Sequence, residues 1–210
     1  MKIYDLTHPL TNHIPVYPGT SQPSFLPSNT IQKDGFRETH LNFDSHTGTH
    51  IDAPAHMLEN GKTLNEFHVG HFTGKALIIT VTENSKFIEK NLLLPFQQEI
   101  SLTDFVLFKT GWSKHWGKPE YFNNYPTLVP EVTDWLMNFP LKGIGFDTIS
   151  ADYEKSGDYP NHLKIFKKNS IIIENLVFPR DLSEKTGIFF CLPLPVENAD
   201  GSTVRAVLLV

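Results

Sequence analysis

The segment from residue 46 to residue 56 gathers side chains that can bind a metal ion. It reads His-Thr-Gly-Thr-His-Ile-Asp-Ala-Pro-Ala-His and contains three of the ten histidines of the chain. Neutral imidazole and carboxylate groups are ligands that suit zinc, manganese or iron. The alternative is a polar loop with solvated histidines, because a single His-x-x-x-His pattern is weak support for a metal site. The four ligand-type side chains of this segment favour the metal site.

The glycine and the proline of this segment influence how its side chains can converge. On an extended chain His50 and Asp52, two residues apart, point to the same side. Gly48 allows the backbone to bend so that His46 can join them. Pro54 favours an extended conformation in the residue before it. We therefore expect no helix across Ala53, and the helical His-x-x-x-His motif of zinc proteases does not apply.

A second group of polar residues lies in the C-terminal third of the chain. It consists of the segment 147–152, which reads Asp-Thr-Ile-Ser-Ala-Asp, followed by His162 and Glu174. Glu174 follows the β-branched run 171–173, where a buried carboxylate is costly unless it is paired or metal-bound. The ordinary alternatives are that Glu174 pairs with Arg180 and that His162 faces water at a helix N-terminus. The residues alone leave these alternatives open.

The composition limits the kinds of metal site and the kinds of binding partner that the chain can have. A single cysteine among 210 residues excludes an intramolecular disulfide and a zinc site made of several thiolates. We expect Cys191 to be a buried strand residue. A chain with a single cysteine also suits a reducing cytoplasm. The net charge of −5 gives no basic surface for nucleic acid. No apolar run is long enough to span a membrane and residues 1–5 are no signal peptide, so we predict a cytoplasmic protein without a membrane partner.

The elements that must position these residues are predicted to be mostly short strands. Apolar alternation and short apolar runs predict strands over residues 2–6, 39–44, 76–81, 105–108, 143–147, 171–173, 187–194 and 204–210. The strand 39–44 should be half-buried, and the last two should pair through a turn at 198–201. Helices are predicted over 130–138, 112–116 and 163–168, and a long loop over 9–27. We therefore predict a mixed α/β fold with a predominantly β core.

These segments resemble the metal-dependent cyclase family, which includes bacterial kynurenine formamidase and isatin hydrolase. Residues 46–56 match the family signature His-x-Gly-Thr-His-x-Asp-x-Pro-x-His. Residues 5–10 with 15–19 are similar to the opening of the family, and residues 105–116 to its middle. Residues 145–152 resemble its Gly-x-Asp-Thr-x-Ser-x-Asp stretch, and residues 193–194 with 204–206 resemble its ending. The resemblance spans nearly the whole chain.

The resemblance implies a swivelling β/β/α fold, in a single metal-dependent hydrolase domain over residues 1–210, that assembles as a homodimer or a larger homo-oligomer. It implies a divalent metal, typically two zinc ions per subunit, with manganese in some members. The implied ligands are His46, His50, Asp52, His162 and Glu174. Asp52 would bridge the first ion, held with His46 and His50, and the second, held with His162 and Glu174. His56 would be the catalytic acid and base and not a ligand.

The same resemblance implies hydrolysis of a small amide, with N-formylkynurenine, an intermediate of tryptophan catabolism, as the leading substrate. Formamidases of the family usually carry Trp before the Pro-Gly of the opening and an acid after it, whereas this chain has Tyr17 and Thr20. Ring opening of a cyclic amide or lactone is the alternative activity. A noncatalytic metal- or ligand-binding protein of the same fold is a third hypothesis, although such a protein has no need of His56. Candidate aromatic pocket walls, equally plausible as core residues, are Phe43, Phe67 and Trp112.

Overall fold

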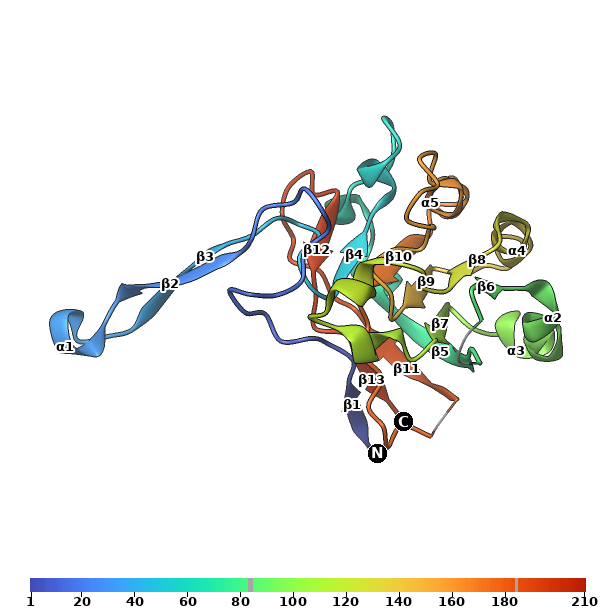
Figure 1. Ribbon diagram of the computed structural model, residues 1–210, viewed down its shortest axis with the longest axis horizontal. Coiled ribbons are helices and arrows are strands. Elements are labelled where there is room, and N and C mark those ends of the chain that lie inside the picture. Colours follow the sequence, from blue (N-terminus) through green and yellow to red (C-terminus); the bar gives the residue numbers. More distant parts are fainter. Residues whose placement is uncertain (83–84, 184) are drawn as a thin grey trace.

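A long mixed sheet forms the centre of the computed structural model, which describes residues 1–82, 85–183 and 185–210. Over these residues the sheet has nine strands, in the order β1-β13-β11-β5-β7-β9-β10-β4-β12 (Figure 1). Strands β5, β7, β9 and β10 run parallel to one another, and the remaining pairs are antiparallel. The strands in this order are Ile3–Asp5, Val207–Leu209, Thr186–Phe190, Thr73–Thr80, Phe105–Lys109, Gly143–Phe146, Ile171–Glu174, His50–Asp52 and Gly201–Thr203.

Shorter elements surround this sheet. Two further strand pairs are β2 (Ser24–Asn29) with β3 (Glu38–Asn42), and β6 (Phe87–Ile88) with β8 (Thr127–Leu128). The α-helices are α1 (Ile31–Asp34), α2 (Lys90–Leu93), α3 (Gln97–Ile100), α4 (Pro130–Leu136) and α5 (Pro160–Phe166). Short 3-10 helices cover Pro54–His56, Leu64–Glu66, Val69–Phe72, Leu94–Phe96, Trp112–His115 and Pro119–Phe122. No helix within the described ranges is long and apolar enough to cross a membrane.

Both faces of the sheet are buried, as its side chains show. In β5, Ile78 belongs to one hydrophobic cluster and its neighbour Ile79 to the other. Such apolar residues on both sides are what a strand needs when each face is covered. Helices α4 and α5 cover the face of Ile79, whereas Tyr4 of β1 and Ile51 of β4 share the cluster of Ile78. Strands from distant places in the sheet therefore share one core, and the sheet curls around it.

Most predicted elements are confirmed, and the mixed α/β fold with a predominantly β core is confirmed with them. The predicted strands over 2–6, 76–81, 105–108, 143–147 and 171–173 correspond to β1, β5, β7, β9 and β10. The last two predicted strands do pair, as β11 with β13. A turn is present at residues 197–198, but the connection is longer than predicted, because Gly201 begins β12, which pairs with β4. Helix α5 begins at Pro160, three residues before the predicted start at residue 163.

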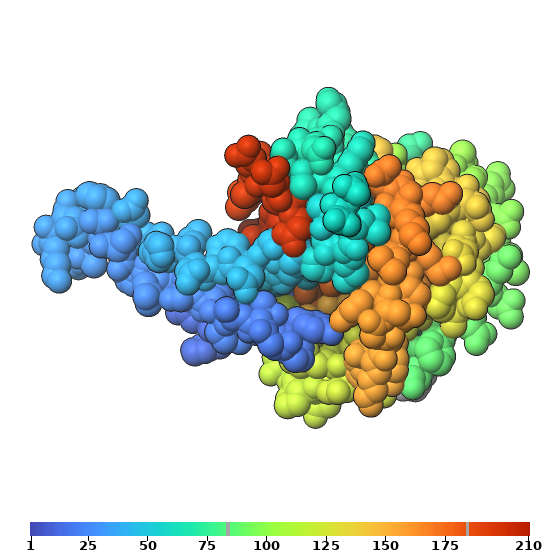
Figure 2. Space-filling view, turned by 90° about the horizontal axis from the view of Figure 1, so that it is seen from above, coloured from blue at the N-terminus to red at the C-terminus, as the bar shows by residue number. Residues whose placement is uncertain are grey.

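A hairpin arm, formed by β2, α1 and β3, projects away from the body of the molecule (Figures 1 and 2). The prediction that the strand over 39–44 is half-buried was wrong, because all five residues of β3 are exposed. The polar–apolar alternation normally marks a strand with one face on a core. Among the described residues β3 pairs with β2 alone, and no other layer covers its apolar side. The predicted loop over 9–27 likewise ends early, since β2 begins at Ser24.

The buried carboxylate of Asp147, just after β9, anchors the turn that follows β7. It accepts hydrogen bonds from the backbone N–H and the hydroxyl of Thr110, at 3.0 and 2.6 Å, and from the Gly111 N–H at 2.8 Å. Burial raises the pKa of Asp147 to about 6, although the bonds from Thr110 and Gly111 act in the opposite direction. The carboxylate therefore has a structural role between two neighbouring strands.

Replacing Asp147 by alanine is expected to lower the free energy of unfolding by about 2–4 kcal/mol, because the buried N–H and hydroxyl of Thr110 and the part-buried N–H of Gly111 lose their acceptor. Urea unfolding monitored by circular dichroism measures this difference. A matched change at the exposed Asp181 should have an effect within about 0.5 kcal/mol. A loss below about 1 kcal/mol for Asp147→Ala would contradict the anchoring role.

Candidate metal centre

Strand β4 lies between β10 and β12 and places its two polar residues on one side of the sheet. Its residues are His50, Ile51 and Asp52, so the first and third side chains share a face, and Ile51 enters the core on the other face. In the register of the sheet His50 lies opposite Glu174 of β10. Gly201 of β12 lies opposite Asp52. The antiparallel pairing thus brings residues more than 120 positions apart to one face.

The loop before β4 brings His46 to the same place. Gly48 adopts a left-handed conformation with φ 67°, and a Cβ atom there would lie 2.8 Å from the side chain of Leu10. Only glycine satisfies both conditions without strain. Ala53 is extended, and a short 3-10 helix over Pro54–His56 follows it. The predicted bend at Gly48 and the extended conformation of Ala53 are therefore confirmed, and the short helix begins only after Ala53.

Helix α5 supplies His162 from the C-terminal half of the chain. The carboxylate of Asp152 accepts hydrogen bonds from the backbone N–H groups of Asn161 and His162, at 2.9 and 3.0 Å. It also contacts Nδ1 of the His162 ring at 2.6 Å. One carboxylate therefore holds both the first turn of the helix and the orientation of the imidazole.

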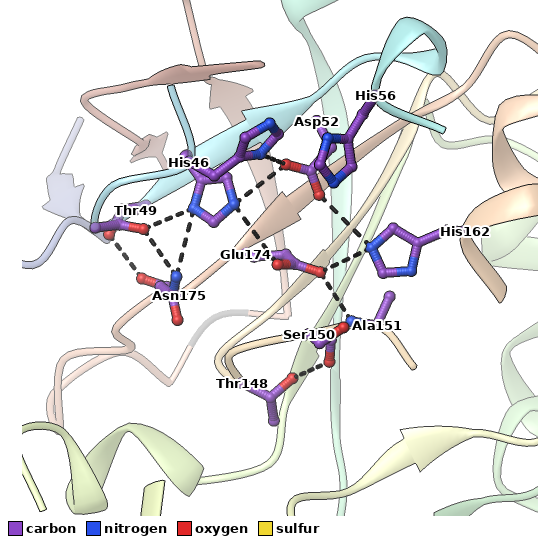
Figure 3. A network of polar contacts seen from close by, with 12 residues as sticks. His46, Thr49, Asp52, His56, Thr148, Ser150, Ala151, His162, Glu174 and Asn175 are labelled. Carbon is purple, nitrogen blue, oxygen red and sulfur yellow. Dashed lines mark hydrogen bonds and ion pairs between the residues drawn. The ribbon is translucent and has the colours of Figure 1, made fainter. Parts of the chain in front are cut away.

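Asp52 lies at the centre of the cluster, and its two oxygens face different partners (Figure 3). Oδ1 lies 2.6 Å from Nδ1 of His46 and 3.1 Å from Nε2 of His50. Oδ2 faces Nε2 of His162 at 3.8 Å. Glu174 faces Nε2 of His50 at 3.6 Å and Nε2 of His162 at 3.3 Å. Two overlapping groups result, each of which could hold a metal ion, and Asp52 belongs to both.

The three imidazoles that face Asp52 are each held at their outer nitrogen. Nε2 of His46 lies 2.9 Å from Asp200, Nδ1 of His50 lies 2.7 Å from the carbonyl oxygen of Gly48, and Nδ1 of His162 contacts Asp152. A ring that donates its outer N–H to an oxygen presents a lone pair on the inner nitrogen, as metal-binding histidines do. The donor set therefore fits a divalent metal at both groups.

The electrostatics of the cluster also favour a bound cation. Burial alone would raise the pKa of Asp52, but His50 and His46 hold it well below its usual range. Burial lowers the pKa of His46, and the charge of Asp52 with the hydrogen bond to Asp200 outweighs this effect and raises it to about 10. Hydrogen bonds to Asp152 and Glu174 likewise raise the pKa of His162 to about 10, against the effect of burial. Both imidazoles are cationic at neutral pH in the metal-free protein.

Metal binding is therefore expected to release about two protons near pH 8, one each from His46 and His162. Because both pKa values are raised from 6.5 to about 10, the stabilising imidazolium–carboxylate contacts are complete below pH 6.5 and are lost as pH rises through about 10. Metal affinity should rise with pH over the same range. Calorimetric titration with Zn²⁺ in two buffers of different ionisation enthalpy counts the protons, and a count near zero would contradict this prediction.

His56 lies at the edge of the cluster, beside the ring of His46 at a centroid distance of 4.0 Å. Its Nδ1 is 3.3 Å from the carboxylate of Asp200. Burial is the largest effect on its pKa and lowers it, so this ring is neutral near pH 7, unlike His46. A neutral imidazole beside the ligands can accept and return a proton.

A cavity of about 350 Å³ opens onto the cluster. Besides the cluster residues it is lined by Tyr17, Thr20, Asp44, Met57, Ile149, Ser150 and Tyr159. The earlier candidates for aromatic walls lie elsewhere, since Phe43 packs on Phe25 and the indole N–H of Trp112 donates to the carbonyl of Tyr121 at 2.9 Å. Phe67 packs against the hydrophobic core. The aromatic walls come instead from the N-terminal loop and from the residue before α5.

The structure places the predicted site residues together and resolves their ordinary alternatives. Glu174 is buried among His50, His162 and the Ala151 N–H, which donates to it at 2.8 Å, and it makes no ion pair with Arg180 among the described contacts. His162 is buried rather than facing water. Cys191 is fully buried, and burial raises the pKa of its thiol, as expected of an inert residue. Sequence reasoning missed Asp152 and Asp200 as partners of the histidines.

The sequence matches a family of known proteins over most of its length. Residues 4–153 match the family model described as "Putative cyclase". The chain is 32% identical over 205 residues to a kynurenine formamidase of Bacillus cereus, covering 97% of this chain and 95% of that protein. It is 30% identical over 208 residues to a kynurenine formamidase of Geobacillus thermodenitrificans, with the same coverage. The chain therefore belongs to the cyclase family.

Solved structures share the fold. A protein described as a potential metal-dependent hydrolase with cyclase activity superposes with a TM-score of 0.82 at 29% identity, covering 99% of this chain and 96% of that chain. An isatin hydrolase bound to the product analogue thioisatinate superposes with a TM-score of 0.89 at 21% identity, covering 100% and 92%. The swivelling β/β/α fold implied by the sequence is thus confirmed.

Proposed function

We propose that this chain is a metal-dependent hydrolase of a small amide, with residues 1–210 acting as one catalytic domain. The two oxygens of Asp52, which face separate groups of ligand atoms, are the observation that carries the proposal. The family membership and the kynurenine formamidases among the relatives support it. The proposed ligands are His46, His50 and Asp52 for one ion, and Asp52, His162 and Glu174 for the other.

The chemistry follows from the donor set. When bound, a divalent metal at these ligands supplies Lewis acidity and lowers the pKa of a water molecule from 15.7 to about 7. His56 carries the proton: its neutral imidazole accepts one during attack on the carbonyl and returns it to the amide nitrogen, which leaves poorly as an anion. The carboxylate of Asp200 at Nδ1 of His56 keeps the opposite nitrogen free for this transfer.

The proposal extends to the metal, the assembly and the compartment. We propose two zinc ions per subunit, with manganese as the alternative, because imidazole and carboxylate ligands accept both metals. We also propose a homodimer or larger homo-oligomer in the cytoplasm, without nucleic acid or membrane partners. The acidic net charge of −5 supports the absence of nucleic acid.

For the substrate, we propose an N-formyl arylamine, with N-formylkynurenine as the leading candidate. Tyr17 and Tyr159 provide aromatic walls for an aryl ring. The carboxylate of Asp44 lines the same cavity and could pair with an α-ammonium group of the substrate. Tyr17 and Thr20, where this chain differs from the usual opening of the formamidases, both line the cavity, so they would tune the fit of the acyl or aryl group.

Ring opening of a cyclic amide is the second candidate, and one feature of the cavity favours it. Among the described residues that line the cavity there is no lysine or arginine to pair with the α-carboxylate of an amino acid. A neutral planar lactam such as isatin needs no such partner and would lie against Tyr17, Met57 and Ile149.

A comparison of the two substrates on the zinc-loaded protein tests the proposal. Formate release from N-formylkynurenine supports the first activity, and loss of isatin absorbance on ring opening supports the second. Manganese-loaded protein is assayed in parallel, with chelator-treated protein as the control. Metal-loaded protein that hydrolyses neither substrate, nor any of a panel of small amides and lactones, would overturn the proposal in favour of a noncatalytic binding protein.

A further inference from the structure

The carboxylate of Asp200 contacts two histidines of the cluster, His46 and His56. Its Oδ2 lies 2.9 Å from Nε2 of His46 and 3.3 Å from Nδ1 of His56. One of these rings is a proposed metal ligand and the other the proposed proton carrier. In the sequence His46 lies 154 positions and His56 144 positions from Asp200. Among the described residues neither ring contacts another carboxylate through these nitrogens.

The carboxylate is itself held in place from several sides. The Ser45 hydroxyl donates to its Oδ1 at 3.0 Å, so the two oxygens have different partners. The backbone carbonyl of Asp200 accepts a hydrogen bond from the Ala53 N–H at 2.8 Å. The next residue, Gly201, begins β12 opposite Asp52. The sheet therefore fixes the carboxylate relative to the proposed bridging ligand.

The close approach of Gly201 to the imidazole of His46 is an independent observation that the backbone here accommodates this ring. A Cβ atom at position 201 would lie 2.5 Å from Cε1 and 2.8 Å from Nε2 of that imidazole, and 2.9 Å from the carbonyl oxygen of Ile51. Contacts this short do not occur between real side chains. The absence of a side chain allows the ring to lie against β12 with its Nε2 at Asp200.

We infer that Asp200 is a positioning residue that fixes the tautomers of both His46 and His56, an inference that rests on the proposed function. An N–H donated from Nε2 of His46 leaves the lone pair on Nδ1, which faces Asp52 and the proposed metal. An N–H donated from Nδ1 of His56 leaves the lone pair on Nε2, where the proposed acid–base group needs it. One carboxylate thereby couples metal binding to proton transfer.

A competing interpretation is that His46, His56 and Asp200 hold a metal ion themselves, since their ligand atoms lie within 4.8 Å of one another. In that case His46 would bind through Nε2 and His56 would have no free nitrogen to carry a proton at this carboxylate. The two interpretations differ in the number of ions bound when Asp200 is changed.

Asp200→Asn in the full chain tests the inference with three measurements. Zn²⁺ titration against a chromophoric chelator should show the wild-type number of ions, one of them bound about 10–100-fold more weakly. Once a substrate is found, kcat should fall by a similar factor while KM stays within about twofold. Long-range ¹H–¹⁵N spectra of the zinc-loaded protein should show that His56 loses its preference for the Nδ1–H tautomer.

Matched variants separate this effect from a general loss of structure. Ser45→Ala releases only the other oxygen and should produce the same changes with smaller size, whereas Asp181→Asn at an exposed ion pair should produce none. Unchanged zinc affinity and an unchanged His56 tautomer in Asp200→Asn would overturn the inference. Loss of one whole ion would overturn it in favour of the competing metal group. A wild-type chain that binds no zinc would instead overturn the proposed function.

Discussion

Replacing His56 by alanine is expected to leave both metal ions bound and to reduce kcat by about 10²–10⁴-fold. The imidazole lies beside the ligand cluster at the cavity but outside the two groups that share Asp52. Its removal should therefore spare the metal sites and eliminate only the proton transfer to the leaving nitrogen. Metal analysis of the purified variant and turnover of the substrate found for the wild type measure the two effects separately.

A second histidine offers the matched control for this experiment. His13 is exposed and lies outside the cavity, so His13→Ala should keep both the metal content and the turnover. Loss of a metal ion from His56→Ala would make His56 a ligand, which agrees with the group that it forms with His46 and Asp200. Full activity with full metal content would remove it from the mechanism.

Replacing Asp52 by asparagine is expected to weaken both metal sites by more than about 100-fold and to abolish turnover. The carboxylate is 1% exposed and its two oxygens face the two groups separately. The amide is neutral and has a single oxygen, so it presents an anionic ligand to neither group and an oxygen to only one. Zinc content after dialysis against a weak chelator measures the loss.

Glu174→Gln is the matched comparison, because Glu174 belongs to only one of the two groups that contain Asp52. That variant should lose one ion and keep the other. If Asp52→Asn also loses only one ion, the bridging role fails. The metal-free Asp52→Asn protein should be less stable as well, by about 3–5 kcal/mol, because the cationic His46 loses a buried partner. Urea unfolding in the presence of chelator separates this loss from weaker metal binding.

The candidate site was predictable to the extent that its ligands follow local rules. His50 and Asp52 share a face because they are two residues apart in a strand, and Gly48 and Pro54 exclude the helical alternative. Glu174 was a candidate because it ends an apolar β-branched run where a lone carboxylate is costly, but the residues alone left an ion pair with Arg180 open. Residue type and spacing carry this information within about ten residues. The resemblance to the cyclase family assigned His162 and Glu174 to the same site as His50 and Asp52.

The arm shows where the same local rules fail. The alternation in β3 correctly predicted a strand, but its burial depended on whether another layer packs against it, and none does among the described residues. The turn predicted over 198–201 from its residue types is present in part, at residues 197–198. Pairing with β4 converts its last residue into the start of β12.

The sequence by itself determined the mixed α/β fold and the chemistry that imidazole and carboxylate ligands can support, because these depend on local periodicity and residue types, whereas the full ligand set was implied by the resemblance to the cyclase family. Only the tertiary structure decided which oxygen faces which nitrogen, that Asp152 and Asp200 hold the outer sides of the histidines, and that Tyr17 and Tyr159 line the cavity. The contacts of Asp200 span 144 and 154 positions of the chain. Contacts over such distances arise from strand pairing and sheet curvature, which spacing along the sequence does not encode.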